Sequence, residues 1–457
     1  MKIVSTNPGR HYEVIGEAEA ASEADIAKAV ENARKAQPLW AELSLKERCD
    51  KIRSFLKVCE GRVDDIAKIM SKEMGKPIGA SREQVESTFG EFEDYMKQAE
   101  QALAPSVVFE NDTEKHIQTL EPRGVIAAIA PWNFPFNNIS FQVGQALIAG
   151  NTVVYKPSEE TVLFTQLIAQ LVAESELPAG VFTPIIGDGR VGEVLVRQNV
   201  DMILFTGSTR TGQRITEIAA ERSIPVLTEM GGSAPGIVFD DAEVPKIINT
   251  FASMRFDNTG QYCDGLKRAI VHVSKYDEFL KGLKEYAANT KIGDQLDEET
   301  KIGPLVAKRQ LDVLEAQVAD AVEKGAEVFI GGKQPEGLEG AYYEVTVLIK
   351  ISPDMRVWKE EVFGPVLPVV TFETEEEAIK LANDTEYGLG AFVFTEDIER
   401  YRRVAKQIKA GNIAHNTAWY FSPSTPFGGY KKSGNGRSQG LPGFHEVTQI
   451  KVIAEEK

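Results

Sequence analysis

Residues 124–232 repeat one pattern: GVIAAIAPWNFP (124–135), NTVVYKPSE (151–159), VFTPIIGDGRVG (181–192), DMILFTGSTRTG (201–212) and PVLTEMGG (225–232). Each begins with a short apolar run typical of a β-strand and ends in polar or glycine residues. Helical stretches at 161–176 and 212–222 separate some of them. This βαβ alternation predicts an α/β fold with a parallel sheet covered by helices. Ligands of such sheets bind beyond the carboxyl ends of the strands, so the residues after each run are expected on one rim.

The flanking sequence extends this architecture. Ser22, followed by Asp25 and by apolar residues at 26, 29, 30 and 33, predicts an amphipathic helix. A second α/β stretch follows residue 233, with strands expected near 269–273, 327–331, 367–372 and 391–395, and helices near 276–290, 305–324, 374–384 and 397–409. Segment 104–122 alternates like a two-stranded excursion. The Gly- and Pro-rich segment 425–444 predicts no regular structure, and VTQIKVIA (447–454) predicts an edge strand.

Composition excludes several classes of protein. With 457 residues, of which 42% are hydrophobic and 26% charged, the chain predicts a large globular protein of two or three domains. A net charge of −17 argues against nucleic acid as a partner. No run reaches membrane-spanning length, so no membrane association is expected. The three cysteines, an odd number without scaffold spacing, predict a reduced, cytoplasmic location, and the five histidines lack the spacing of a metal site.

Two segments are candidates for binding a dinucleotide. GDGRVG (187–192) matches the GxGxxG pattern, although it follows the third strand of the series, and a tight strand–helix turn explains it equally well. Gly207-Ser208-Thr209 offers a hydroxyl and free N–H groups at a helix start, which favours the pyrophosphate. Lys156 and Glu159 can reach ribose hydroxyls, and the acid favours NAD over NADP, whereas their spacing alone fits a surface ion pair.

One cysteine is a candidate nucleophile. Cys263 lies in NTGQYCDG (258–265), a glycine-containing loop before an expected strand, whereas Cys49 and Cys59 fall in a helical pattern. A buried inert thiol is the alternative interpretation, since that is the usual state of a cysteine. No histidine stands in a suggestive motif, so any base is expected to be a carboxylate such as Glu229.

The whole chain resembles the NAD(P)-dependent aldehyde dehydrogenase superfamily. The resemblance rests on motifs in the family's order and approximate spacing: PWNFP, KPSE, FTGSTRTG, TEMGG, GQYC, EEVFGPV (360–366), PFGGYKKSG (426–434) and GR (436–437). TEMGG departs from the frequent LELGG but keeps the acid and both glycines. Ser438 stands where an acidic residue is common.

The resemblance implies three catalytic residues. Cys263 is the nucleophile, and the side-chain amide of Asn133 forms an oxyanion hole with the Cys263 backbone N–H. Glu229 is the general base for hydrolysis of the thioester that remains after hydride leaves a thiohemiacetal. A glutamate that only ends a strand is the alternative for Glu229.

The resemblance also implies cofactor contacts from both lobes. Glu361 and Phe363 of the second lobe hold the nicotinamide ribose and ring, and Ser208 contacts the pyrophosphate. The remaining contacts are Lys156 and Glu159 at the adenosine ribose and, nearby, Trp132 and Gly207. For Trp132 a position in the core is the alternative.

The resemblance divides the chain into a Rossmann-like NAD-binding domain (1–103 and 123–230), a catalytic domain (231–430) and a small β oligomerisation element (104–122 and 446–457). A homodimer or homotetramer is therefore expected.

The function expected is NAD-dependent oxidation of a short aliphatic aldehyde or semialdehyde to the acid. Arg255 is a candidate for binding a semialdehyde carboxylate, such as that of succinate semialdehyde, although Asp257 would oppose an anion. Tyr262 is expected to form an aromatic wall beside Cys263. A CoA-acylating relative and a catalytically idle scaffold are the alternatives; Glu229 disfavours the first, and its presence with Cys263 and Asn133 disfavours the second.

Overall fold

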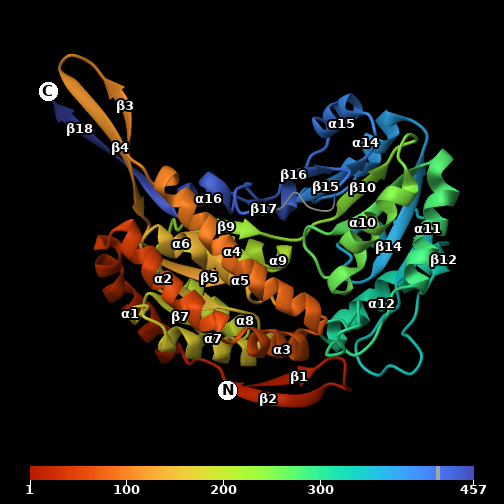
Figure 1. Cartoon of the computed structure of the whole chain (residues 1–457), viewed down its shortest axis with the longest axis horizontal. Helices are drawn as coiled ribbons and strands as arrows, with labels where there is room; N and C mark the ends of the chain where they lie inside the picture. The colour runs from red at the N-terminus through yellow and green to blue at the C-terminus, as the bar shows by residue number, and fades with distance from the viewer. Residues whose placement is uncertain (418–421) are drawn as a thin grey trace.

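In the computed structural model the chain forms two α/β lobes and a projecting three-stranded sheet (Figure 1). The structure describes residues 1–417 and 422–457. The strands of the first sheet are β5 (Val125–Ile129), β6 (Thr152–Lys156), β7 (Phe182–Pro184), β8 (Met202–Thr206), β9 (Val226–Glu229) and β17 (Gly434–Asn435). The helices of this lobe are α1 (Glu23–Glu42), α2 (Leu45–Glu60), α3 (Val63–Met74), α4 (Ile78–Ala102), α5 (Asn137–Ile139), α6 (Gln145–Ile148), α7 (Val162–Glu174), α8 (Gly189–Val196), α9 (Thr209–Ala220) and α16 (Gly440–Glu446).

The first sheet confirms the predicted parallel α/β architecture. Its strand order is β17-β9-β8-β5-β6-β7, and every neighbouring pair is parallel except β17 with β9. The chain order reverses between β5 and β8, and this switch point is where sheets of this kind bind ligands. PWNFP follows β5 and TGST begins at the end of β8, so both segments lie at the switch point.

Strand alternation sorts the side chains of this sheet onto two faces. Val125, Ala127 and Ile129 of β5 pack into a core with α1, α8 and α9. Ile126 and Ala128 point to the opposite face, where they join a core with α2, α3, α4 and α7. Because both faces are covered, the sheet is buried, and the residues beyond its strand ends are the part left accessible.

The second lobe is built on a seven-stranded sheet of order β12-β13-β14-β11-β10-β15-β16. Its strands are β10 (Ala234–Val238), β11 (Leu266–His272), β12 (Glu327–Ile330), β13 (Thr346–Ile349), β14 (Val366–Phe372), β15 (Gly390–Phe394) and β16 (Asn412–His415). Its helices are α10 (Val244–Phe256), α11 (Tyr276–Ala288), α12 (Lys308–Glu323), α13 (Arg356–Lys359), α14 (Glu375–Asn383) and α15 (Ile398–Ala405). The strands and helices expected in this half of the chain are confirmed.

The third sheet projects from the body with the C-terminus at its tip (Figure 1). It contains β3 (Ser106–Glu110), β4 (Glu114–Pro122) and β18 (Thr448–Glu456), and β18 pairs antiparallel with β4 along its full length. The predicted excursion and edge strand are therefore confirmed. A further hairpin, β1 (Lys2–Asn7) with β2 (Glu13–Glu19), begins the chain.

Two local predictions have different outcomes. Ser22 caps α1 in a capping box with Asp25, as predicted. The expectation that 425–444 has no regular structure is wrong in part, because β17 and the first turns of α16 lie there. Packing explains the difference: Phe444 of α16 is fully buried in the first core, and this burial offsets the weak helix propensity of the segment.

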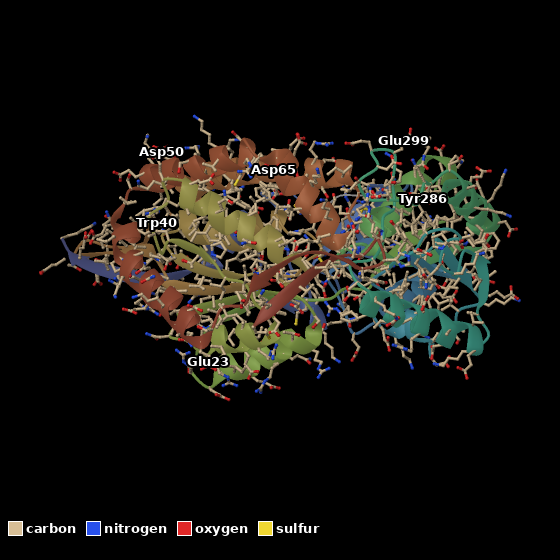
Figure 2. All side chains as sticks on the ribbon, turned by 90° about the horizontal axis from the view of Figure 1, so that it is seen from below. Glu23, Trp40, Asp50, Asp65, Tyr286 and Glu299 are labelled. Atoms are coloured by element: carbon tan, nitrogen blue, oxygen red, sulfur yellow. The ribbon has the colours of Figure 1, made fainter. Side chains whose placement is uncertain are left out.

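Side chains on the outside of the molecule are mostly polar. Figure 2 shows labelled acids such as Glu23 and Asp50 on the outer helices. Trp40, also labelled there, is buried, and its indole N–H donates a hydrogen bond of 2.9 Å to the Leu147 carbonyl. Among the helices in the described residues, none is long and apolar enough to cross a membrane.

Candidate active site

Two cavities meet at the junction of the lobes. One, of about 510 Å³, runs along the strand ends of the first sheet, and the other, of about 620 Å³, lies between the start of α4 and the loop before β11. Both are lined by Asn133, Thr206, Glu229, Met230 and Cys263. The three predicted catalytic residues therefore share the wall at which the cavities join.

A left-handed turn carries Cys263 to this wall. Asn258, Thr259 and Gly260 have φ angles of 49°, 58° and 71°. A side chain at Gly260 would place Cβ 2.3 Å from the Gly364 carbonyl oxygen, so glycine is required for the loop to approach the 361–364 segment. Left-handed backbone costs about 1–2 kcal/mol at each non-glycine residue, so the surrounding bonds must hold the turn in place.

Those bonds tie the turn to Asn133. The Asn133 side-chain amide donates to the Gln261 carbonyl at 3.0 Å, and the Asn258 amide donates to the Asn133 carbonyl at 3.2 Å. The Gln261 side chain in turn accepts from the Val306 N–H at 3.0 Å. Asn133 is thereby fixed beside the loop of the nucleophile, where an amide donor can stabilise an oxyanion.

Cys263 is half-buried, and it is the cysteine whose side chain lines both cavities. Its Sγ donates to Asp264 Oδ1 at 3.8 Å. Burial raises the pKa of this thiol, the neighbouring Asp264 raises it further, and Lys267 opposes the rise. Cys49 and Cys59 are buried in α2, where burial raises the pKa of each thiol. Only Cys263 thus combines access with nearby charged groups.

Glu229, the last residue of β9, is 2% exposed. Neither of its carboxylate oxygens has a hydrogen-bond partner among the described residues, although both are buried. Burial raises its pKa well above the usual range, and the positive charge of Arg437 acts against this rise. A carboxylate with unused lone pairs and an increased proton affinity is suited to take a proton from water.

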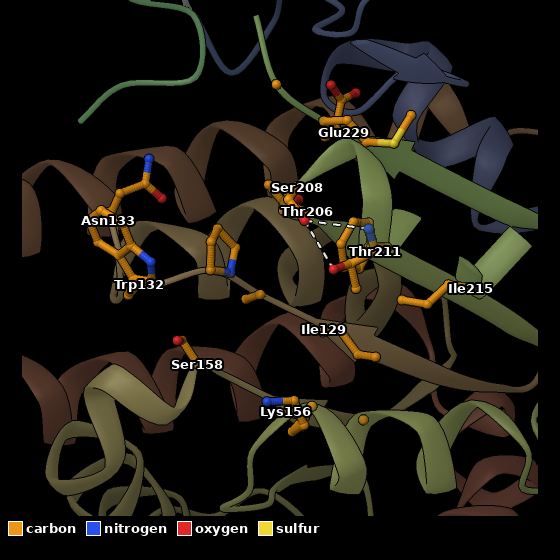
Figure 3. A pocket seen from close by; sticks show the side chains of 18 of the residues that line it. Ile129, Trp132, Asn133, Lys156, Ser158, Thr206, Ser208, Thr211, Ile215 and Glu229 are labelled. Atoms are coloured by element: carbon orange, nitrogen blue, oxygen red, sulfur yellow. Dashed lines mark hydrogen bonds between the residues drawn. The ribbon is translucent and has the colours of Figure 1, made fainter. Parts of the chain in front are cut away.

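All seven predicted cofactor contacts line the first cavity, which Figure 3 shows from close by: Trp132, Lys156, Glu159, Gly207, Ser208, Glu361 and Phe363. Lys156 is buried, and its ammonium donates to the carbonyls of Pro157 (2.7 Å) and Gly187 (2.9 Å). Burial lowers its pKa to about 8. The alternative of a surface ion pair with Glu159 is therefore wrong for Lys156.

The two glycine-containing turns lie at helix starts along this cavity. Ser208 caps α9, and its Oγ accepts from the Thr211 N–H at 3.4 Å, a bond drawn in Figure 3. A Cβ at Gly207 would lie 2.6 Å from the Phe205 ring, so glycine is needed there. Asp188 caps α8, and Gly192 packs against Lys156 while also lining the cavity. The N-termini of α8 and α9 can therefore both face a phosphate. In GDGRVG the glycine at 192 also allows close packing against Lys156.

Glu361 and Phe363 reach this cavity from the second lobe. Glu361 accepts from the Gly232 N–H at 3.1 Å and from the Lys267 ammonium at 3.0 Å. The Phe363 ring packs edge-to-face on Trp132, with 5.6 Å between centroids. Trp132 therefore lies on the cavity wall and not in a core. Helix starts, buried polar groups and contacts from both lobes along one elongated cavity fit a dinucleotide.

The prediction that Arg255 binds the substrate is wrong. Arg255 is 1% exposed and lines neither cavity. Its guanidinium donates to the backbone carbonyls of Leu266, Val362, Gly364 and Val366. Through these bonds Arg255 joins α10 to β11, to β14 and to the 362–364 segment, and its buried guanidinium does not reach the ligand cavities.

The second cavity is lined by both aromatic and charged side chains. Tyr262 lines it and packs edge-to-face on Phe134, with centroids 4.8 Å apart. Asp257 also lines it, and burial raises the pKa of this carboxyl to about 6. Sequence reasoning missed two cations there, Lys76 and Lys301. Lys76 lies in the segment GKP between two helices, and nothing in that segment alone indicates a cavity.

Comparison with known proteins identifies the family of the chain. The sequence profile of the aldehyde dehydrogenase family matches residues 1–453. A glutarate-semialdehyde dehydrogenase of Pseudomonas aeruginosa is 35% identical over 443 residues, which cover 96% of this chain and 92% of that protein.

Two solved structures superpose on the whole chain. An NAD-dependent aldehyde dehydrogenase of Sinorhizobium meliloti has a TM-score of 0.96 and 36% identity, covering 100% of this chain and 91% of that one. An NADP-dependent enzyme of E. coli has a TM-score of 0.96 and 34% identity, covering 100% and 95%. With the family profile matched almost end to end and the site residues brought together, the chain is an enzyme of the aldehyde dehydrogenase family.

Proposed function

We propose that this enzyme oxidises a short aliphatic aldehyde or semialdehyde, such as succinate semialdehyde, to the carboxylic acid with NAD as the hydride acceptor. The observation that carries the proposal is the placement of Asn133, Glu229 and Cys263 on the wall shared by the two cavities. Aldehyde in the second cavity and NAD in the first would then meet at one thiol.

The side chains divide the reaction between them. The Cys263 sulfur attacks the carbonyl carbon, and the Asn133 amide with the Cys263 backbone N–H stabilises the oxyanion of the thiohemiacetal. NAD supplies an acceptor for the hydride that leaves this carbon, and a thioester remains on Cys263. Glu229 then takes a proton from a water molecule, which attacks the thioester and releases the acid.

Preference for NAD over NADP is part of the proposal. Glu159 follows Lys156 at the end of β6, and it lines the first cavity. A carboxylate there can accept hydrogen bonds from ribose hydroxyls but repels a 2′-phosphate.

A lysine that lines the second cavity supports a semialdehyde as the substrate. Because Arg255 is excluded, the distal carboxylate of a semialdehyde would meet Lys301, which lines this cavity. The Pseudomonas relative is described as acting on a semialdehyde of this kind.

The proposal includes a homodimer or homotetramer in the cytoplasm. Phe109, Ile450 and Val452 share one face of the third sheet and are all at least 45% exposed, and such an apolar surface fits contact with a second copy of the chain. A reduced compartment keeps the Cys263 thiol free. A monomer by light scattering at micromolar concentration would contradict the oligomeric part.

The test is NADH absorbance with purified enzyme, NAD or NADP, and a panel of aldehydes with and without CoA. The proposal expects oxidation without CoA, with NAD preferred and semialdehydes among the substrates. Activity that requires CoA would show an acylating enzyme and overturn the role of Glu229. No reduction of either cofactor with any aldehyde would favour the idle scaffold.

A further inference from the structure

A buried lysine lies between the nucleophile and the cofactor segment. Lys267, on β11, stands four residues after Cys263, and its side chain is 1% exposed. Its ammonium lies 3.0 Å from Glu361 Oε1 and 3.5 Å from the carbonyl oxygens of both Gly232 and Cys263. Lysine is almost never fully buried without a partner, because its charge loses hydration, and Glu361 is the partner here.

The ammonium connects three parts of the site. It pairs with Glu361, lies 5.1 Å from the centroid of the Phe363 ring, and bonds to the backbone of the nucleophile's own loop. Glu361 also accepts from the Gly232 N–H, three residues after Glu229. One cation therefore holds the 361–363 segment of the second lobe against the loop of the nucleophile.

We propose that Lys267 is a positioning residue that couples Cys263 to the cofactor segment: it fixes Glu361 and Phe363 in place and supplies the positive charge that favours the Cys263 thiolate. The coupling to the cofactor rests on the proposed function. The effect on the Cys263 thiol depends only on residues of the chain, so it is measured without cofactor or substrate.

The charges around the thiol support this role. Burial and Asp264 raise the pKa of Cys263, Glu361 and Glu229 add to the rise, and Lys267 opposes it. Burial lowers the pKa of Lys267 itself, with Glu361 acting against this and Arg255 of α10 adding to it. Among the described residues that line the two cavities there is no histidine, and Lys267 is a cation whose charge lowers the pKa of Cys263.

The two members of the ion pair act on the thiol with opposite signs. Removing Lys267 leaves the Glu361 charge unpaired, and both changes disfavour the thiolate. Neutralising Glu361 removes an anion that raises the pKa of Cys263, and this change favours the thiolate. If the ion pair served only to hold the fold, both variants would change the reactivity of Cys263 in the same direction, because either substitution breaks the same contact.

The experiment compares Lys267→Met, Glu361→Gln and Lys267→Arg with the exposed control Lys281→Met. Alkylation of Cys263 by iodoacetamide is followed in the full-length, cofactor-free enzyme from about pH 6 to about pH 10, with the Cys263 peptide quantified by mass spectrometry. At about pH 7.5 we expect Lys267→Met to slow alkylation about tenfold and Glu361→Gln to accelerate it several-fold. Lys267→Arg keeps the charge and stays near the wild-type rate, as does Lys281→Met.

Affinity for NAD is measured separately by quenching of tryptophan fluorescence. Lys267→Met is expected to weaken binding about tenfold, and Lys267→Arg to restore most of it. Equal slowing of alkylation by Lys267→Met and Glu361→Gln, or no change in either, overturns the inference. If Lys267→Met does not fold, Lys267→Gln, which keeps a polar side chain beside Glu361, takes its place in the same comparison. Failure of the proposed function would instead leave the alkylation pattern intact with no aldehyde oxidised.

Discussion

The side-chain amide of Asn133 donates a hydrogen bond of 3.0 Å to the backbone carbonyl of Gln261, two residues before Cys263. This bond orients a donor from the first lobe toward the nucleophile of the second. The substitution Asn133→Ala removes this amide, which is one preorganised donor to the oxyanion. We therefore expect kcat to fall about 10²–10³-fold. Stopped-flow measurement of NADH formation checks this.

Asn133→Asp is the matched variant, because it keeps the size of the side chain and loses the amide donor. It should lose as much activity as Asn133→Ala while the KM for NAD changes little. An Asn133→Ala enzyme with nearly wild-type kcat would contradict the oxyanion role.

Glu229→Gln separates the two halves of the reaction. Glutamine fills the same buried space but cannot take a proton, so the thioester should form and persist. We expect a burst of NADH of about one equivalent per active site, followed by turnover slowed about 10²–10⁴-fold. Rapid-quench mass spectrometry should find the acyl group on Cys263. Unchanged steady-state turnover would show that another group activates water.

The pH dependence follows from the same residue. Because burial raises the pKa of Glu229 well above its usual range, the carboxyl is protonated and inactive at low pH and becomes a base as pH rises. The rate of thioester hydrolysis should therefore increase with pH above the usual titration range of a glutamate, and this increase should be absent in Glu229→Gln. A wild-type rate of thioester hydrolysis that falls as pH rises would contradict the role of Glu229 as the base.

Arg255→Met tests the correction of the substrate site. It leaves four backbone carbonyls without their buried donor, which should cost about 3–5 kcal/mol of unfolding free energy. Denaturant unfolding measures the loss. The ratio of kcat/KM for anionic and neutral aldehydes should stay unchanged in the folded fraction; a selective loss for the anionic aldehyde would restore Arg255 to the substrate site.

Lys76 should make stability depend on pH. Burial lowers the pKa of Lys76 to about 7, whereas the unfolded side chain titrates near 10.5. Between these values the unfolded state binds more protons, so the Lys76 contribution to stability rises with pH and is least favourable below about pH 7. From about pH 7 to about pH 9.5, wild type should gain on the order of 3 kcal/mol relative to Lys76→Met. A gap that does not change with pH would contradict this.

The sequence predicts the sheets well because local signals and packing agree there. The apolar runs before PWNFP and TGST form buried parallel strands, and Ser22 caps α1 as its spacing indicates. Segment 425–444 is the exception, since α16 forms by burying Phe444 against a core assembled from distant residues. No local pattern contains that information.

The site is predictable where a motif carries its residues and not where the fold supplies the contact. Cys263 and Glu229 follow from motifs, but Arg255 is misassigned because its proximity to Cys263 in sequence says nothing of the carbonyls that surround it. Lys267 is missed although it leaves a signal. LKRAIVH places two basic residues in an otherwise apolar strand, and a charge there predicts a buried partner.

The proposed reaction requires that the Cys263 sulfur forms the bond to the substrate carbonyl carbon. Cys263→Ser keeps the shape of the side chain and replaces the sulfur, and it is tested by NADH absorbance with NAD and the best aldehyde of the panel. In this variant no NADH is expected above the rate without enzyme, and NAD binding is expected to be retained. Oxidation at an undiminished rate in Cys263→Ser would contradict it.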